Sequence, residues 1–240
     1  MVGIAIGVVL LPDLSRRLAA QDHAGGRHAF SRAGEAALML TIPSAVALVT
    51  IPLPLVSVMF ERGATTGTDS RAIALAVALY GLGLPAFVLQ KILQPLYFAR
   101  ENTRTPFYYA LAAMILNAAV AIGLAPLLGW YAPAIATTLA GWAMVLLLMR
   151  GRRSMGEVAR FDARFAGRIW RICAAALVMG AVLLGAAHLL RGPLETAGLR
   201  YIALAGLIVL GMAVYFVTGR LIGAFRLSEF GLMLGRRRRG

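Results

Sequence analysis

Acidic residues are scarce in this chain of 240 residues, which has 10 Asp and Glu against 24 Lys and Arg. None of the acids lies in the middle of an apolar run, which disfavours a relay of carboxylates that carries protons across a membrane. The single cysteine, Cys173, excludes an internal disulfide. The histidines, His23, His28 and His188, are scattered, so no metal site is expected. No nucleotide-binding glycine pattern and no nucleophile motif is present, so neither a cofactor nor an enzyme activity is predicted.

Apolar residues dominate instead. They make up 60% of the chain, charged residues make up only 14%, and the mean hydropathy is +0.79. A soluble domain has about 45–50% apolar and about 25% charged residues. A helix that spans a membrane needs about 20 mostly apolar residues. Six segments approach or meet that length: 36–60, 72–90, 106–128, 132–149, 172–190 and 201–219. The sequence therefore predicts an all-α, polytopic helical membrane protein with six full transmembrane helices.

The basic residues lie very unevenly between these spans. Of the 24 Lys and Arg, 20 fall on one side, in segments 13–35, 91–105 and 150–171 and in the tail from residue 220. Cations next to membrane spans are retained in the cytoplasm, so this side and the C-terminus are predicted to be cytoplasmic. The net charge of +14 does not indicate nucleic-acid binding, because the basic residues flank spans. They set topology and contact anionic lipid headgroups.

The first apolar run is too short to cross a membrane. Residues 1–11 would reach about 17 Å as a helix, against a hydrocarbon core of about 30 Å. A short re-entrant or interfacial helix would need a polar face, which this run lacks. We therefore expect a truncated N-terminal helix, and the C-terminal part of a longer protein. The predicted organisation is 1–35, the end of that helix and an inner loop; 36–149, four spans; 150–171, a basic cytoplasmic linker; 172–220, a two-helix hairpin; and 221–240, a basic cytoplasmic tail.

A few polar residues interrupt the apolar runs. Gln90, Lys91 and Gln94 lie close together in the apolar run YGLGLPAFVLQKILQPLYF, at the inner end of the predicted span 72–90. Lys91 either faces a cavity or extends its amine to the headgroups at the inner surface, and Gln94 is one helical turn away. Asn117 lies in the middle of its span, where it either bonds another helix or lines a cavity. Thr137, Thr138 and Gly141 indicate close packing of helices.

Four short segments, in order along the chain, carry a resemblance to a known family. They are GVVLLPDLSR at 7–16, IPSAVAL at 42–48, FERG at 60–63 and YFARENTRTP at 97–106. With them the chain resembles the MurJ/MviN lipid II flippases, of the multidrug/oligosaccharidyl-lipid/polysaccharide exporter superfamily. The resemblance implies a fourteen-helix fold with two lobes around a cationic cavity, and two further helices that form a groove for the polyprenyl tail. It also implies transport of lipid II, the lipid-linked peptidoglycan precursor, from the inner to the outer leaflet of the bacterial cytoplasmic membrane.

On that pattern, residues 1–12 match the end of the eighth helix, 36–149 match helices nine to twelve, and the last two spans match thirteen and fourteen. Lys91 matches a lysine of the tenth helix, whereas the family's essential cavity arginines lie in a part that this chain lacks. The candidate substrate-binding residues are Lys91, Gln90, Gln94, Asn117, Arg100 and Arg104. The implied partners are lipid II, anionic membrane lipids and the cell-wall synthesis machinery. A related polysaccharide-lipid or multidrug exporter, and a non-transporting remnant, stay open as alternatives.

Overall fold

The computed structural model describes residues 2–61, 67–196 and 198–224. Within these ranges the chain is helical and contains no strand, which confirms the all-α prediction. The α-helices are α1 (Val2–Ala19), α2 (His23–Thr50), α3 (Pro52–Phe60), α4 (Gly67–Phe98), α5 (Arg104–Leu128), α6 (Ala132–Gly151), α7 (Ala163–Leu189), α8 (Arg191–Glu195) and α9 (Leu199–Leu221). Short 3-10 turns lie between them: η1 (Gly129–Tyr131), η2 (Arg152–Met155) and η3 (Glu157–Ala159).

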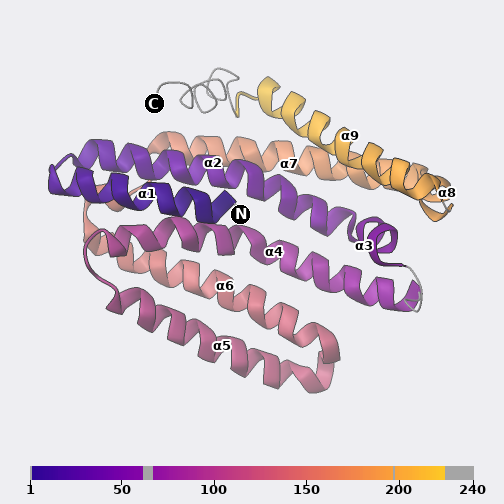
Figure 1. Ribbon diagram of the computed structural model, residues 1–240, viewed down its shortest axis with the longest axis horizontal. Helices are drawn as coiled ribbons and strands as arrows, with labels where there is room; N and C mark the ends of the chain where they lie inside the picture. The colour runs from indigo at the N-terminus through magenta and orange to yellow at the C-terminus, as the bar shows by residue number, and fades with distance from the viewer. Residues whose placement is uncertain (1, 62–66, 197, 225–240) are drawn as a thin grey trace.

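Five stretches of the described chain are long and apolar enough to cross a membrane. They are His23–Thr50, Gly67–Phe98, Arg104–Gly151, Arg164–Leu189 and Leu199–Leu221. The third stretch contains two helices, α5 and α6, which η1 joins into a hairpin (Figure 1). Several large apolar side chains are exposed on these helices, including Ile122 on α5 and Leu146 on α6. Apolar outward faces are what helices in contact with lipid require.

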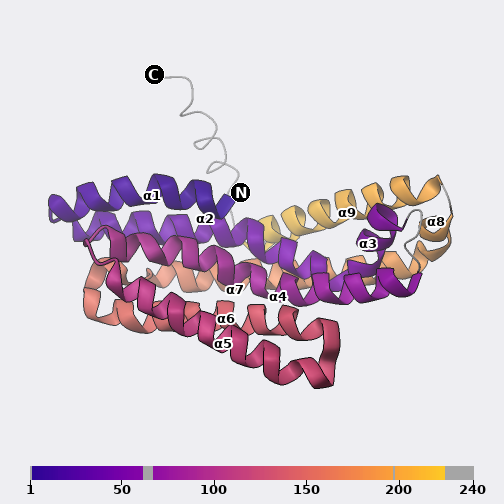
Figure 2. The same cartoon turned by 60° about the horizontal axis from the view of Figure 1, so that its bottom comes forward.

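The long helices lie side by side in an elongated bundle, with α2 and α4 between α7 on one side and α6 on the other (Figures 1 and 2). Helix α2 packs on α4 and on α7, α6 packs between α4 and α5, and α9 packs on α7. Two clusters of buried side chains follow from this arrangement. One joins α1, α2, α4 and α6 around Tyr97, Phe30 and Leu148. The other joins α7, α9 and the end of α2 around Ile51, Leu183 and Leu207.

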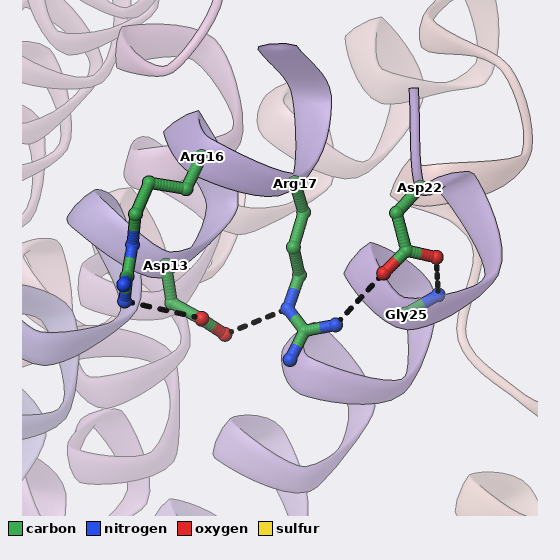
Figure 3. Close-up of polar contacts among 5 residues, drawn as sticks. All are labelled: Asp13, Arg16, Arg17, Asp22 and Gly25. Atoms are coloured by element: carbon green, nitrogen blue, oxygen red, sulfur yellow. Dashed lines mark hydrogen bonds and ion pairs between the residues drawn. The ribbon is translucent and has the colours of Figure 1, made fainter. Parts of the chain in front are cut away.

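Most of segment 13–35, which we expected to be an inner loop that could contain a short amphipathic helix, is helical. Helix α1 continues through Pro12 to Ala19, and α2 starts at His23, so only residues 20–22 form a turn. Polar contacts across this turn explain the difference (Figure 3). Arg17 binds Asp13 at 3.0 Å and Asp22 at 2.9 Å, and Asp22 caps α2 by accepting a hydrogen bond from the Gly25 amide. The hydrogen bond from the Gly25 amide holds the pKa of Asp22 below its ordinary value, and the interaction with Arg17 makes a smaller contribution in the same direction.

The predicted span 36–60 is broken at Ile51. Helix α2 ends at Thr50, Ile51 has non-helical dihedral angles (φ −124°, ψ 42°), and α3 begins at Pro52. A residue that precedes proline is disfavoured in the helical region, which explains why the break lies here. Pro43, by contrast, lies inside α2. Proline content alone therefore did not identify which proline ends the helix.

The basic linker predicted over 150–171 is shorter, because α6 extends to Gly151 and α7 begins at Ala163. It is also firmly packed on α2. The ring of Phe161 stacks between those of Phe30 and Phe165, with centroid distances of 4.6 and 3.9 Å. Next to it, Asp162 forms an ion pair with Arg27 at 2.7 Å, and the His28 Nδ1 lies 2.9 Å from the Asp162 carboxylate. The linker thus joins α2 to the last helices.

Candidate functional site

Three of the six predicted site residues line one hollow between α4, α5 and α6. Its volume is about 460 Å³. Gln90 and Gln94 reach it from α4, and Asn117 reaches it from α5. The other lining residues are Phe87, Ala110, Ala113, Met114, Ala118, Thr137, Ala140, Gly141 and Met144. The hollow is therefore mostly apolar, with a few amide and hydroxyl groups that converge on it.

Two of these amides also hold the helices together. The Gln90 Nε2 donates to the Gly141 carbonyl at 2.9 Å, and the Asn117 Nδ2 donates to the Thr137 Oγ1 at 3.3 Å. Polar side chains that bond across helices are a common device in membrane proteins. Within the described part of the chain, the side-chain amide of Gln94 forms no hydrogen bond. Of the three, Gln94 is the side chain best able to bind a ligand.

Close packing between α4 and α6 shapes the wall of the hollow. A Cβ atom at Gly141 would lie 2.8 Å from the Phe87 ring, so only glycine fits there without a shift. The Thr138 hydroxyl donates to the Leu79 carbonyl at 2.8 Å. These contacts agree with the prediction that Thr138 and Gly141 mark close helix packing.

Lys91 lies apart from this hollow. Its side chain is exposed, and it is not among the lining residues, although its neighbour Gln90 is. Adjacent residues on a helix point about 100° apart, which separates the two side chains. Although Gln94 is one helical turn from Lys91, only Gln94 lies at the hollow.

The predicted arginines of the α4–α5 turn also lie outside the hollow. Arg100 is half-buried, and its Nη2 donates to the carbonyl of Met155 in the α6–α7 linker. Burial lowers the pKa of Arg100. Arg104 is exposed at the first residue of α5. Arg100 therefore positions the linker, while Arg104 is open at the surface.

A second hollow was missed by the sequence analysis. It lies where α6 meets the linker, has a volume of about 590 Å³, and is lined by four arginines with three apolar residues: Arg150, Arg152, Arg153, Arg160, Leu146, Met149 and Ala159. The sequence analysis interpreted these arginines as charges that set topology and contact anionic lipid headgroups, and it did not predict that they line a hollow. Because Arg160 lies several residues beyond the others, its closeness to them depends on how the linker folds back.

Comparisons with known proteins agree over nearly the whole chain. A profile described as lipid II flippase MurJ matches residues 1–219. A probable lipid II flippase MurJ of Rhizobium meliloti (strain 1021) is 39% identical over 231 residues, which are 95% of this chain and 43% of that protein. One of Rhizobium tropici is 35% identical over 99% of this chain and 45% of its own length. The chain thus spans less than half the length of these relatives.

A solved structure gives the same fold. Lipid II flippase MurJ in an inward closed conformation superposes with a TM-score of 0.73 at 24% identity. The superposition covers 92% of this chain and 43% of the solved one.

Proposed function

This chain belongs to the lipid II flippase MurJ family, and we propose that it forms part of a transporter that moves lipid II from the inner to the outer leaflet of the bacterial cytoplasmic membrane. The observation that carries the proposal is the match of residues 1–219 to that family. Since the chain spans 43% of the Rhizobium meliloti relative, the proposal concerns a protein in which the unmatched part is also present. Such a protein would be a transporter rather than an enzyme.

The proposed topology has six membrane spans within a fourteen-helix fold. In it, α5 and α6 cross separately, because each has 20 or more residues and η1 joins them into a hairpin. The turn at 20–22, the α4–α5 turn and the α6–α7 linker then lie in the cytoplasm, as their basic residues favour. The C-terminus lies there as well. Residues 225–240, with the predicted basic tail, are outside the described part of the chain.

A reporter fused after residue 65 is expected to be periplasmic, and one fused after residue 155 is expected to be cytoplasmic. The reason is the excess of Lys and Arg on the side that contains residue 155. Paired alkaline phosphatase and green fluorescent protein fusions measure both positions. Inverted signals at the two sites would contradict the topology.

The headgroup of lipid II carries a pyrophosphate, which needs cations along its path. Lys and Arg bind phosphate oxygens by charge-assisted hydrogen bonds. We place Lys91 on the path, since it is the one cation inside the apolar run of α4 and its side chain is exposed. Gln94, Gln90 and Asn117 would contact uncharged sugar or peptide groups at the hollow. Arg100 and Arg104 lie at the cytoplasmic entrance in this proposal, and α7 with α9 form the groove for the polyprenyl tail.

Lys91→Met is expected to reduce lipid II transport about tenfold or more, because the loss of a charge-assisted contact costs about 1.5–3 kcal/mol. The test uses a chimera of this chain with the unmatched part of the Rhizobium meliloti relative, and it measures lipid II exposure at the outer leaflet at equal membrane abundance.

Lys91→Arg is the matched control and should retain most transport, because it keeps the positive charge. If Lys91→Met transports as well as the parent chimera, Lys91 only anchors α4 at the interface. If the parent chimera moves another lipid-linked saccharide or a drug but not lipid II, the related-exporter alternative replaces the proposed function.

A further inference from the structure

The hollow at the end of α6 combines a dense positive charge with an apolar wall. Arg150, Arg152, Arg153 and Arg160 line it, and Leu146 and Met149, near the end of α6, form its apolar wall. Leu146 is 65% exposed. Among the side chains that the structure describes, no carboxylate forms an ion pair with these arginines. Their charge is therefore not neutralised by described residues.

One of the four arginines is built into the fold. Arg152 donates from Nη1 to the Ala159 carbonyl, and its guanidinium lies 4.5 Å from the centroid of the Phe161 ring. Phe161 is itself fixed by stacking on Phe30 and Phe165. Burial, together with the nearby charge of Arg153, lowers the pKa of Arg152. A bound anion would offset both effects.

Arg153 and Arg160 are exposed at the rim, where their donors are open to a ligand. Guanidinium groups bind phosphate oxygens in a bidentate manner, which favours phosphate as the anion. The volume of about 590 Å³ lies within the range of small-molecule sites. In the proposed topology, its position at the end of an apolar helix would place the apolar wall at the level of acyl chains and the arginines at the level of headgroups.

We propose that the hollow lined by Arg150, Arg152, Arg153 and Arg160 binds the phosphate headgroup of an anionic phospholipid at the cytoplasmic surface, with the start of an acyl chain against Leu146 and Met149. Basic pockets next to membrane helices on the cytoplasmic side recognise such headgroups. The site is separate from the hollow of Gln90, Gln94 and Asn117 and does not depend on lipid II transport. A lipid bound here would join the end of α6 to the linker that packs on α2.

The test measures binding of phosphatidylglycerol to the purified chain in detergent, by native mass spectrometry and by the rise in melting temperature. The double variant Arg153→Gln/Arg160→Gln is expected to bind about 30-fold more weakly, and each single variant about fivefold more weakly. Both residues are exposed and form no described bond within the protein, so folding should be retained. Should the double variant not fold, the single variants carry the same test.

The matched control is Arg32→Gln/Arg220→Gln, which removes two exposed arginines elsewhere and should leave the affinity unchanged. Phosphatidylcholine, inorganic phosphate and pyrophosphate should each stabilise the chain much less than phosphatidylglycerol. Equal phosphatidylglycerol binding by the pocket and control variants would overturn the site. Equal stabilisation by phosphatidylcholine would overturn the need for an anionic headgroup. Equal stabilisation by phosphate or pyrophosphate would show that a soluble anion, and not a lipid, is the ligand.

Discussion

Replacing Glu35 with alanine is expected to lower the free energy of unfolding by about 3–5 kcal/mol, because it removes one partner of a buried ion pair. Glu35 on α2 binds Arg168 on α7 at 2.6 Å, and the two side chains are only 10% and 13% exposed. Without the carboxylate, the guanidinium of Arg168 keeps its desolvation cost and loses the attraction of Glu35. The measurement is the unfolding equilibrium in mixed micelles.

Two further variants separate charge burial from a general effect of mutation. Arg16→Gln breaks an exposed pair, with 3.6 Å between Arg16 and Asp13, and should change stability by less than about 1 kcal/mol. Glu35→Leu/Arg168→Met removes both charges and should be closer in stability to the parent than Glu35→Ala is. If Glu35→Ala unfolds as Arg16→Gln does, this ion pair does not stabilise the packing of α2 on α7.

The second large effect concerns growth. Cells depleted of their own lipid II flippase are expected not to grow when only these 240 residues are supplied. The chain matches 43% of the Rhizobium meliloti relative, and alternating access by two rocking lobes requires both lobes. The chimera with the unmatched part of that relative should restore growth. Colony formation after depletion, at equal membrane abundance of the two proteins, measures the difference.

The chimera is also the positive control for this experiment. Since 39% identity indicates the same fold, its two parts should assemble. Growth supported by the 240 residues alone would show that transport does not need the unmatched part, and the two-lobe proposal would then be wrong.

The sequence predicted the helices well, because lengths of apolar run determine which segments can be buried in a membrane. It failed where short-range polar contacts decided the outcome. The Asp13–Arg17–Asp22 contacts join two helices by a tight turn, where we expected an inner loop with at most a short amphipathic helix. At Ile51 a proline broke the helix, whereas Pro43, in the same apolar run, did not. Apolar content does not distinguish these two prolines.

The candidate site could be predicted only in part. Composition marks Gln90, Lys91 and Gln94 as unusual in an apolar run, but the sequence does not give the rotation of α4 about its axis. That rotation depends on packing, for example of Phe87 against Gly141, and it separates Lys91 from the hollow. The arginine-lined hollow was missed for a related reason. The linker folds back because Phe161 stacks on Phe30 and Phe165. The spacing of residues along the linker does not indicate this stacking.

The packed linker also limits how the molecule can move. Since Phe161 and Asp162 join the linker to α2, and Glu35 joins α2 to Arg168, helices α2 and α7 should shift as one rigid unit. Bending is easiest where the fewest hydrogen bonds break. Pro52 and Pro54 have no amide hydrogen, so the chain just after Ile51 lacks two backbone donors. The joint between α2 and α3 is thus the point at which α3 can tilt relative to α2, while the end of this unit that packs on the linker stays fixed.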